Sequence, residues 1–345
     1  MPSKKALLLL LVLIGPGCLR LAADDAKLPG KHILTEESGT LFVQDPDGTN
    51  RHKIAEKAGA AALSRDGNLV AYADDKAVRV FSLLDGQSVI VARLTDASVN
   101  NLAWSPDQKH LAYDLMVRMK SWDLFLASYP PAGDAPRNLG HWYETLSFSP
   151  NGKFIVHPAF DATGPPAPPN ILETVNVETG KRETIYKGAT TIWEAKYSPD
   201  GSSIAFMMTD PAWEATESDS GGAVTDLWIL RLDTKKAERI MPGVFDFDWS
   251  PDGKSLAIGK GTDVGDYPPD DGAVFISSVD GKDQFQISKN APSLRAKFSP
   301  DSKEVIFVDF NASRLVIGDL ATRKLTPMPG AGSKEYGGNA VYDWK

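Results

Sequence analysis

The sequence predicts an all-β fold, a β-propeller of seven four-stranded blades. Two observations support this prediction. A turn motif built from Ser, Pro, Asp and Gly recurs along the 345 residues, and successive motif serines stand 41 to 52 residues apart. A second series of short apolar segments, one for each interval, supplies further strands. Repeats of this length with several short strands each are typical of propeller blades.

The turn motif is clearest at Trp249-Ser250-Pro251-Asp252-Gly253, which lies between two apolar runs. Proline presets its own φ, aspartate bonds the nearby backbone, and glycine accepts a positive φ. A turn this short between alternating apolar runs predicts a β-hairpin. The motif serines are Ser64, Ser105, Ser149, Ser198, Ser250 and Ser299.

The second series contains seven strands, one more than the motifs. They are residues 40–43, 78–81, 123–126, 175–177, 227–230, 274–276 and 315–317. The chain ends account for the difference, since 340–345 matches a strand before a motif and 28–34 matches a turn with the strand after it. We therefore expect N- and C-terminal strands to close the last blade. Six blades with an irregular N-terminal arm is the alternative.

The residues just before the motif serines should pack between neighbouring blades, because they share one position on the innermost strands. These residues are Leu63, Trp104, Phe148, Tyr197, Trp249 and Phe298, with Trp344 in the equivalent place near the C-terminus.

The repeat resembles that of TolB-type periplasmic proteins, and also the propellers of prolyl-oligopeptidase-like peptidases. The resemblance covers residues 27–345, which we expect to form one TolB-like propeller domain. It implies an exported scaffold. The α/β domain that precedes the propeller in TolB, and the hydrolase domain of the peptidases, have no expected counterpart in this sequence.

The composition excludes several classes of protein. The formal net charge of −8 argues against a general affinity for nucleic acid. Cys18 is the only cysteine, so the body of the chain offers neither thiol catalysis nor cysteine-ligated metal. No apolar segment has the length of a transmembrane helix.

The N-terminus is interpreted as a targeting segment. Lys4 and Lys5 precede the apolar run 6–14, a pattern typical of a signal peptide. Cleavage after Ala23 makes residues 1–23 the signal peptide and predicts a periplasmic or extracellular protein. In the alternative, Cys18 carries a lipid anchor and the protein is a membrane-anchored lipoprotein, although Gly15 stands where such proteins usually have Leu.

No catalytic motif is found: the sequence lacks a Gly-x-Ser-x-Gly elbow, a His-Glu-x-x-His pair and a phosphate-binding loop. We therefore predict a non-enzymatic protein without a cofactor. Four acids at 263, 266, 270 and 271 offer oxygen ligands for Ca²⁺, but Asp263 to Asp271 fit no EF-hand spacing, so no metal is predicted.

Two regions are candidates for binding. Long connections at 160–170, 209–225 and 259–272 should extend from one face of three adjacent blades, and two of them are acidic. Loops of this length are usually functional or disordered. The other region is the mouth of the central channel. The candidate binding residues in these regions are Asn101, Trp142, Trp193, Glu194, Trp213, Asp246 and Arg295.

The predicted function is therefore binding of a protein or peptide partner in the cell envelope, through the face with the long connections. Two alternatives are kept. One is a hydrolase or lyase that uses Glu194 and Asp246 as an acid–base pair at the channel mouth. The other is the propeller subunit of a two-chain peptidase.

Overall fold

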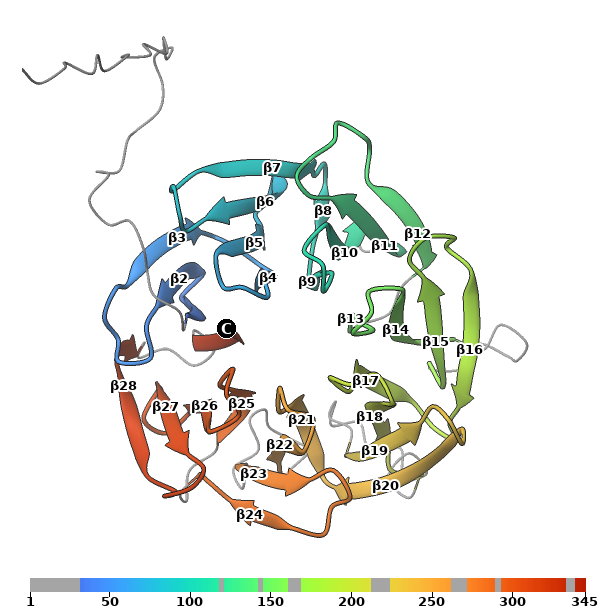
Figure 1. Ribbon diagram of the computed structural model, residues 1–345, viewed down its shortest axis with the longest axis vertical. Helices are drawn as coiled ribbons and strands as arrows, with labels where there is room; N and C mark the ends of the chain where they lie inside the picture. The colour runs from blue at the N-terminus through green and yellow to red at the C-terminus, as the bar shows by residue number, and fades with distance from the viewer. Residues whose placement is uncertain are drawn as a thin grey trace, which may run out of the picture.

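The structure is a computed structural model that describes residues 32–117, 121–141, 145–160, 169–211, 224–261, 272–288, 293–332 and 339–345. Its strands form seven four-stranded antiparallel sheets arranged as blades in a ring (Figure 1). The predicted seven-bladed propeller is thus confirmed, and the six-bladed alternative is wrong. No helix within these ranges is long and apolar enough to span a bilayer.

Each blade contributes four strands, named A to D from the centre outwards; blade 1 contains β1 and the numbering follows the chain. The A strands are β29 (Asn339–Trp344), β4 (Ala61–Leu63), β8 (Ala97–Ser98) with β9 (Leu102–Trp104), β13 (Ser147–Phe148), β17 (Ile192–Tyr197), β21 (Val244–Trp249) and β25 (Ser293–Phe298). The B strands are β1 (Ile33–Glu37), β5 (Leu69–Ala73), β10 (His110–Val117), β14 (Phe154–Ala159), β18 (Ser203–Thr209), β22 (Ser255–Lys260) and β26 (Glu304–Asp309).

The outer half of each blade is completed by strands C and D. The C strands are β2 (Thr40–Gln44), β6 (Ala77–Ser82), β11 (Ser121–Ser128), β15 (Ile171–Asn176), β19 (Thr225–Arg231), β23 (Ala273–Ser278) and β27 (Arg314–Asp319). The D strands are β3 (His52–Glu56), β7 (Ser88–Arg93), β12 (Arg137–His141), β16 (Arg182–Lys187), β20 (Lys236–Pro242), β24 (Gln284–Gln286) and β28 (Leu325–Gly332).

Blade 1 is built from both ends of the ring's chain, as predicted. Strand β29 pairs antiparallel with β1, and Ile33 lies opposite Trp344. Beyond this pair, the His32 amide donates to the Lys345 carbonyl at 2.6 Å, and the Lys345 amide donates to the His32 carbonyl at 3.0 Å. The two segments therefore close the ring through hydrogen bonds and packing.

The motif serine organises each A–B turn. In blade 6 the Ser250 hydroxyl donates to Asp252 Oδ1 at 2.7 Å and accepts from the Ser255 amide at 2.9 Å. Asp252 Oδ1 also accepts from the Lys254 amide, and Gly253 has a φ of +71°. Serine, aspartate and glycine each have a defined role in the turn geometry. The six motif serines are all buried.

Neighbouring turns also pack on one another. A side chain placed on Gly253 would lie 3.6 Å from the ring of Pro199 in the preceding blade, and Gly201 has the same relation to Pro150 at 3.2 Å. The motif proline of one blade therefore covers the motif glycine of the next. This contact explains why proline and glycine recur together in the repeat.

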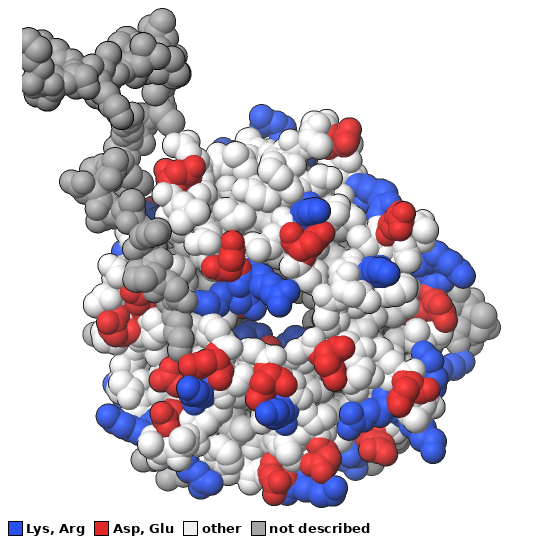
Figure 2. Space-filling view, in the orientation of Figure 1, with Lys and Arg blue, Asp and Glu red and all other residues white. Residues whose placement is uncertain are grey.

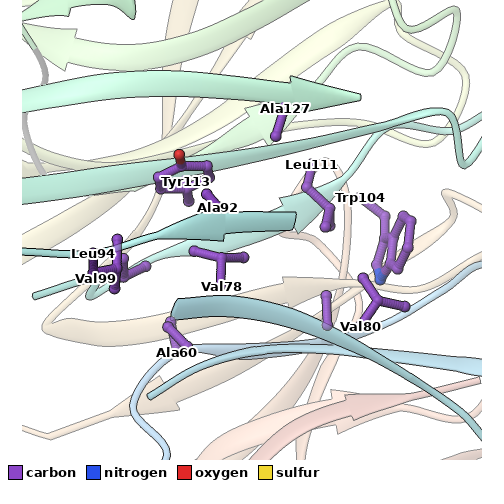
Figure 3. Packing of buried hydrophobic residues seen from close by; sticks show 12 residues of the cluster. Ala60, Val78, Val80, Ala92, Leu94, Val99, Trp104, Leu111, Tyr113 and Ala127 are labelled. Carbon is purple, nitrogen blue, oxygen red and sulfur yellow. The ribbon is translucent and has the colours of Figure 1, made fainter. Parts of the chain in front are cut away.

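The core lies between the blades, where the faces of adjacent sheets meet. Figure 3 shows one such cluster between blades 2 and 3, in which Val78 and Val80 of β6 face Leu111 and Trp104 of the next blade. Leu63, Trp104, Trp249, Phe298 and Trp344 are buried, and Phe148 and Tyr197 are partly buried against their clusters. The predicted packing of the pre-serine residues between blades is confirmed.

The alternating strand directions give the ring two ends. We call the end with the A–B and C–D turns the turn end, and the end with the B–C and D–A connections the connection end. The A strands run from the connection end towards the turn end. Residues four before a motif serine therefore lie nearer the connection end than residues two before it.

Candidate functional site

The A strands of blades 5, 6, 7 and 1 carry charged side chains around the central channel. Figure 2 shows an opening at the centre of the ring, bordered by residues of both charges. We call these A-strand residues, together with Lys345 directly after β29, the inner charge network; its members are Glu194, Lys196, Asp246, Asp248, Arg295, Lys297, Asp343 and Lys345. Four cations and four anions balance, so the network has no net charge.

A β-bulge interrupts the inner ladder of each of these four blades. The register shifts between Ile192 and Ala195 in blade 5, between Val244 and Asp246 in blade 6, and between Leu294 and Lys297 in blade 7. Blade 1 has its shift between Leu34 and Thr35 on the β1 side. Bulges redirect side chains and are frequent next to functional sites.

The ion pairs of the network cross blade boundaries. Lys196 Nζ of β17 pairs with Glu194 of the same strand at 2.7 Å, and it also lies 4.0 Å from Asp248 Oδ1 of β21 and donates to the Phe247 carbonyl of β21 at 2.6 Å. Lys297 Nζ of β25 lies 3.4 Å from Asp248 Oδ1 of β21. Burial acts to lower the pKa of Lys297, but the charge of Asp248 and of other nearby carboxylates raises it, so this lysine stays protonated. The network thus links adjacent A strands.

Asp246 differs from the other carboxylates. Its Oδ2 accepts a hydrogen bond from the backbone amide of Arg295, whose φ is +58°. Its Oδ1 is shielded from solvent and has no hydrogen-bond partner among the described residues. Burial raises the pKa of Asp246, and the nearby charge of Glu194 raises it further. A carboxyl group with these properties is suited to accept, hold or donate a proton, or to bind a donor from a ligand.

The opposite half of the channel has small neutral side chains at the equivalent positions. Two residues before the motif serine, blades 2, 3 and 4 have Ala62, Ala103 and Ser147. The Ser147 hydroxyl accepts from the Tyr197 amide at 3.1 Å, and the Thr145 hydroxyl accepts from the Ala195 amide at 3.0 Å. At this position of the A strands, the residues are therefore charged in blades 5, 6, 7 and 1 and neutral in blades 2, 3 and 4.

The structure brings together three of the predicted site residues, Glu194, Asp246 and Arg295. It does not bring Asn101 and Trp193 to them. Asn101 lies where the A strand of blade 3 is interrupted, and its Nδ2 donates to buried Asp114 at 2.7 Å. Trp193 packs against the core between blades 5 and 6, and its Nε1 donates to Thr209 at 2.8 Å.

The remaining candidates lie outside the described residues. These are Trp142, Trp213 and the acidic segment from Asp263 to Asp271, for which no metal was predicted, together with the predicted signal peptide and Cys18. The described residues hold no group of three or more His, Cys, Asp or Glu side chains arranged for a metal ion.

The sequence analysis missed the second position of the network, occupied by Lys196, Asp248, Lys297 and Asp343. A signal was present, because residues two apart on a strand point to the same face. Placing the fourth residue before each serine at the channel therefore implies that the second one faces it too. Lys345 was missed for another reason. It follows Trp344 as a motif serine follows its aromatic neighbour, but it is a lysine and no Pro-Asp-Gly sequence comes after it.

A second hollow opens between blades 3 and 4 at the turn end, with a volume of about 680 Å³. Its walls carry His110, Asp134, Arg137, Lys153 and Glu178. Arg137 donates to the Glu178 carbonyl. The volume falls in the range of ligand sites, roughly 300–1,000 Å³. No single sequence motif marks this groove, because its lining comes from four different strands and three turns.

Comparison with known proteins identifies the fold. TolB from Acinetobacter baumannii superposes with a TM-score of 0.55 at 14% identity, over 74% of this chain and 63% of that protein. The chain has the fold of the TolB-type propellers. The chain therefore spans less than two thirds of the A. baumannii TolB. Neither a protein-family model nor a curated protein matches the sequence.

Structures of enzymes also resemble this chain. An oligogalacturonate lyase from Vibrio parahaemolyticus has a TM-score of 0.61 at 14% identity, over 86% of this chain and 85% of the enzyme. A prolyl endopeptidase matches with a TM-score of 0.58 at 12% identity, over 89% of this chain but 47% of the enzyme. At these identities the likeness concerns the fold alone.

Proposed function

We propose that this protein is an exported binding scaffold whose connection end holds a basic segment of a protein or peptide partner in the cell envelope. The observation that carries the proposal is the length of three connections. The B–C connections of blades 4, 5 and 6 contain 11, 15 and 12 residues, whereas those of the other four blades contain two to four. The three blades are neighbours, so their connections leave the ring side by side.

The charge of these connections indicates the chemistry of the partner. Residues 160–170, 210–224 and 261–272 together contain nine Asp and Glu and no Lys or Arg. This is more negative charge than the net charge of the entire chain. A cationic partner segment is the electrostatic complement of such a surface, and complementarity of this kind chiefly raises the rate of association.

Exposed apolar side chains lie at the same end. Phe160, which follows β14, is 54% exposed, and Val117, the last residue of β10, is 36% exposed. They belong to adjacent blades 4 and 3. Apolar anchors beside a charged rim are typical of protein-binding surfaces.

The test is cross-linking of the protein in its native envelope, followed by identification of the partner. Glu214→Gln, Glu217→Gln and Asp219→Asn combined should reduce the cross-linked product several-fold, and raised ionic strength should do the same. The matched control neutralises three exposed acids at the turn end, Asp134, Glu178 and Asp233. Equal cross-linking by the two triple variants would refute the proposed face.

A second candidate function, a hydrolase or lyase at the channel mouth, is favoured by one observation. Asp246 combines a raised pKa, a shielded oxygen without a hydrogen-bond partner in the described residues, and a second carboxylate nearby in Glu194. Two carboxylates whose surroundings separate their pKa values are an arrangement used in acid–base catalysis. A turnover screen of polysaccharide and peptide substrates should then show activity that Asp246→Asn and Glu194→Gln each abolish. No turnover by the wild type on either class would remove this candidate.

The proposal of a two-chain peptidase has a separate readout. It requires a hydrolase to purify with this protein, and the same cross-linking experiment would identify that subunit.

Export itself is checked by cell fractionation, with Cys18→Ala separating the two proposed routes: only a lipoprotein would leave the membrane fraction on this substitution.

A further inference from the structure

The groove between blades 3 and 4 at the turn end has an apolar floor. These blades are neighbours in the ring (Figure 1), and they pack on each other through a core cluster that includes Leu124 of β11 and Val175 of β15. Leu126 and Val177 are buried members of the same cluster and also line the groove of about 680 Å³. A ligand in the groove would therefore lie over apolar side chains.

One wall of the groove is the C–D connection of blade 3, residues 129–136. It has eight residues, whereas the C–D connections of the other six blades have four to seven. Three of the eight are prolines, which restrict the backbone of this wall. The equivalent hollow between blades 5 and 6 lies beside a connection of four residues, and its volume is about 350 Å³. The larger groove thus accompanies the longest connection.

Two cationic side chains from opposite walls line the groove. Arg137 begins β12 of blade 3, and Lys153 follows the motif glycine of blade 4. Both are exposed, and neither forms an ion pair with a carboxylate of the described chain. Arg137 uses one donor on the Glu178 carbonyl, which leaves its other donors available. An arginine with available donors beside a lysine is suited to bind a carboxylate.

Two carboxylates line the same groove. Asp134 belongs to the long connection and Glu178 to the C–D turn of blade 4; both are exposed and have no ion pair with another described residue. In the smaller hollow the corresponding acid, Asp280, pairs with Lys282 at 2.8 Å. The larger groove thus offers charges of both signs to a ligand. A purely anionic ligand would be repelled by the two acids, whereas a zwitterion satisfies both signs.

We propose that this groove binds a short peptide with free ends and apolar side chains. The carboxylate of such a peptide pairs with Arg137 and Lys153. Its ammonium group pairs with Asp134 and Glu178, and its side chains cover the apolar floor. This inference goes beyond the proposed function, because the groove lies at the turn end and the long connections lie at the connection end.

The experiment is calorimetric titration of the full chain with leucyl-leucine, up to roughly 10 mM. The wild type should bind the peptide at a single site. N-acetyl-leucyl-leucine lacks the ammonium and leucyl-leucinamide lacks the carboxylate. Each should bind about tenfold more weakly, the effect of losing one hydrogen bond to a charged group. Absence of leucyl-leucine binding, or unchanged affinity for either modified peptide, would overturn the inference.

A lysine substitution locates the site. Lys153→Gln should lower the affinity for leucyl-leucine about tenfold. The matched control, Lys303→Gln, changes the exposed lysine at the same place of the repeat in blade 7 and should bind as the wild type does. Urea midpoints equal to that of the wild type establish that both variants are folded. Wild-type affinity in Lys153→Gln, or an equal loss in the two variants, would contradict binding in this groove.

A second substitution tests the space rather than the charge. Ser128 is exposed on the groove wall, opposite His110 on the neighbouring strand, and Ser128→Trp should fill the groove and abolish binding. Ser82 has the equivalent position in blade 2, opposite Leu69, so Ser82→Trp should leave binding unchanged. Retained affinity in a folded Ser128→Trp variant would place the peptide outside the groove and refute the proposal.

Discussion

Replacing Trp344 by alanine tests the closure of the ring. This tryptophan is 2% exposed and packs with Ile33 of β1 and with Ile306 and Leu315 of blade 7. Truncating a buried Trp or Phe to Ala typically costs about 3–5 kcal/mol. Since a domain is stable by only about 5–15 kcal/mol, Trp344→Ala should remove a large part of the stability. Urea unfolding gives the free energy directly, and the thermal midpoint should fall by roughly 2 °C for each kcal/mol.

Two further variants separate ring closure from loss of volume. Trp344 Nε1 is buried and has no hydrogen-bond partner among the described residues, so Trp344→Phe removes an unsatisfied donor and should cost well under half as much as alanine. Trp249→Ala makes the same truncation in blade 6, whose strands are continuous in the chain, and should also cost about 3–5 kcal/mol. A loss below about 1 kcal/mol for Trp344→Ala would show that β29 contributes little to the ring.

Three other perturbations follow from the structure. Gln108 holds a φ of +58° where four other motif turns have glycine, so Gln108→Gly should raise the free energy of unfolding by about 0.5–1 kcal/mol in urea titration. Burial lowers the pKa of the His157 imidazole below the value near 6.5 that it has in the unfolded chain. The stability that neutral His157 contributes is therefore present above about pH 6.5 and is lost as the pH falls. His157→Gln should make the urea midpoint depend less on pH between pH 7.5 and 5. Burial raises the pKa of the Asp246 carboxyl above the value of about 4 that it has in the unfolded chain. The wild type therefore loses stability as the pH rises above about 4. Asp246→Asn should raise the urea midpoint at pH 7 but not at pH 3.

The fold followed from the sequence because its signal is local and repeated. Each turn uses residues whose roles are set within five positions of chain, as at Ser250, and six copies repeat the same chemistry. The closure of blade 1 was also predictable, since Trp344 stands in the same pattern as Trp249. Two of the six copies lack the glycine, at Gln108 and Ser302, yet they form the same turn with a positive φ.

The candidate site was predicted only in part, because side-chain direction near the channel depends on bulges. A bulge changes the face to which later residues point, and the sequence carries no direct mark of it. Trp193 illustrates this, since it lies next to Glu194 but packs into the core. Asn101 illustrates a different cause: its partner Asp114 lies on the next strand, and the hydrogen bond depends on the interruption of strand A in blade 3.

The pairing of β1 with β29 has a consequence for how the chain folds. About 300 residues separate the two strands, so this contact has the longest sequence separation in the ring. During synthesis β1 to β3 emerge first and keep an unpaired inner edge until β29 is available, a condition that favours slow folding and association with other chains. Blades 2 to 7 can each assemble from contiguous sequence as they appear. Blade 1 must therefore be the last to form, and the rate at which it forms determines how long the incomplete ring is exposed.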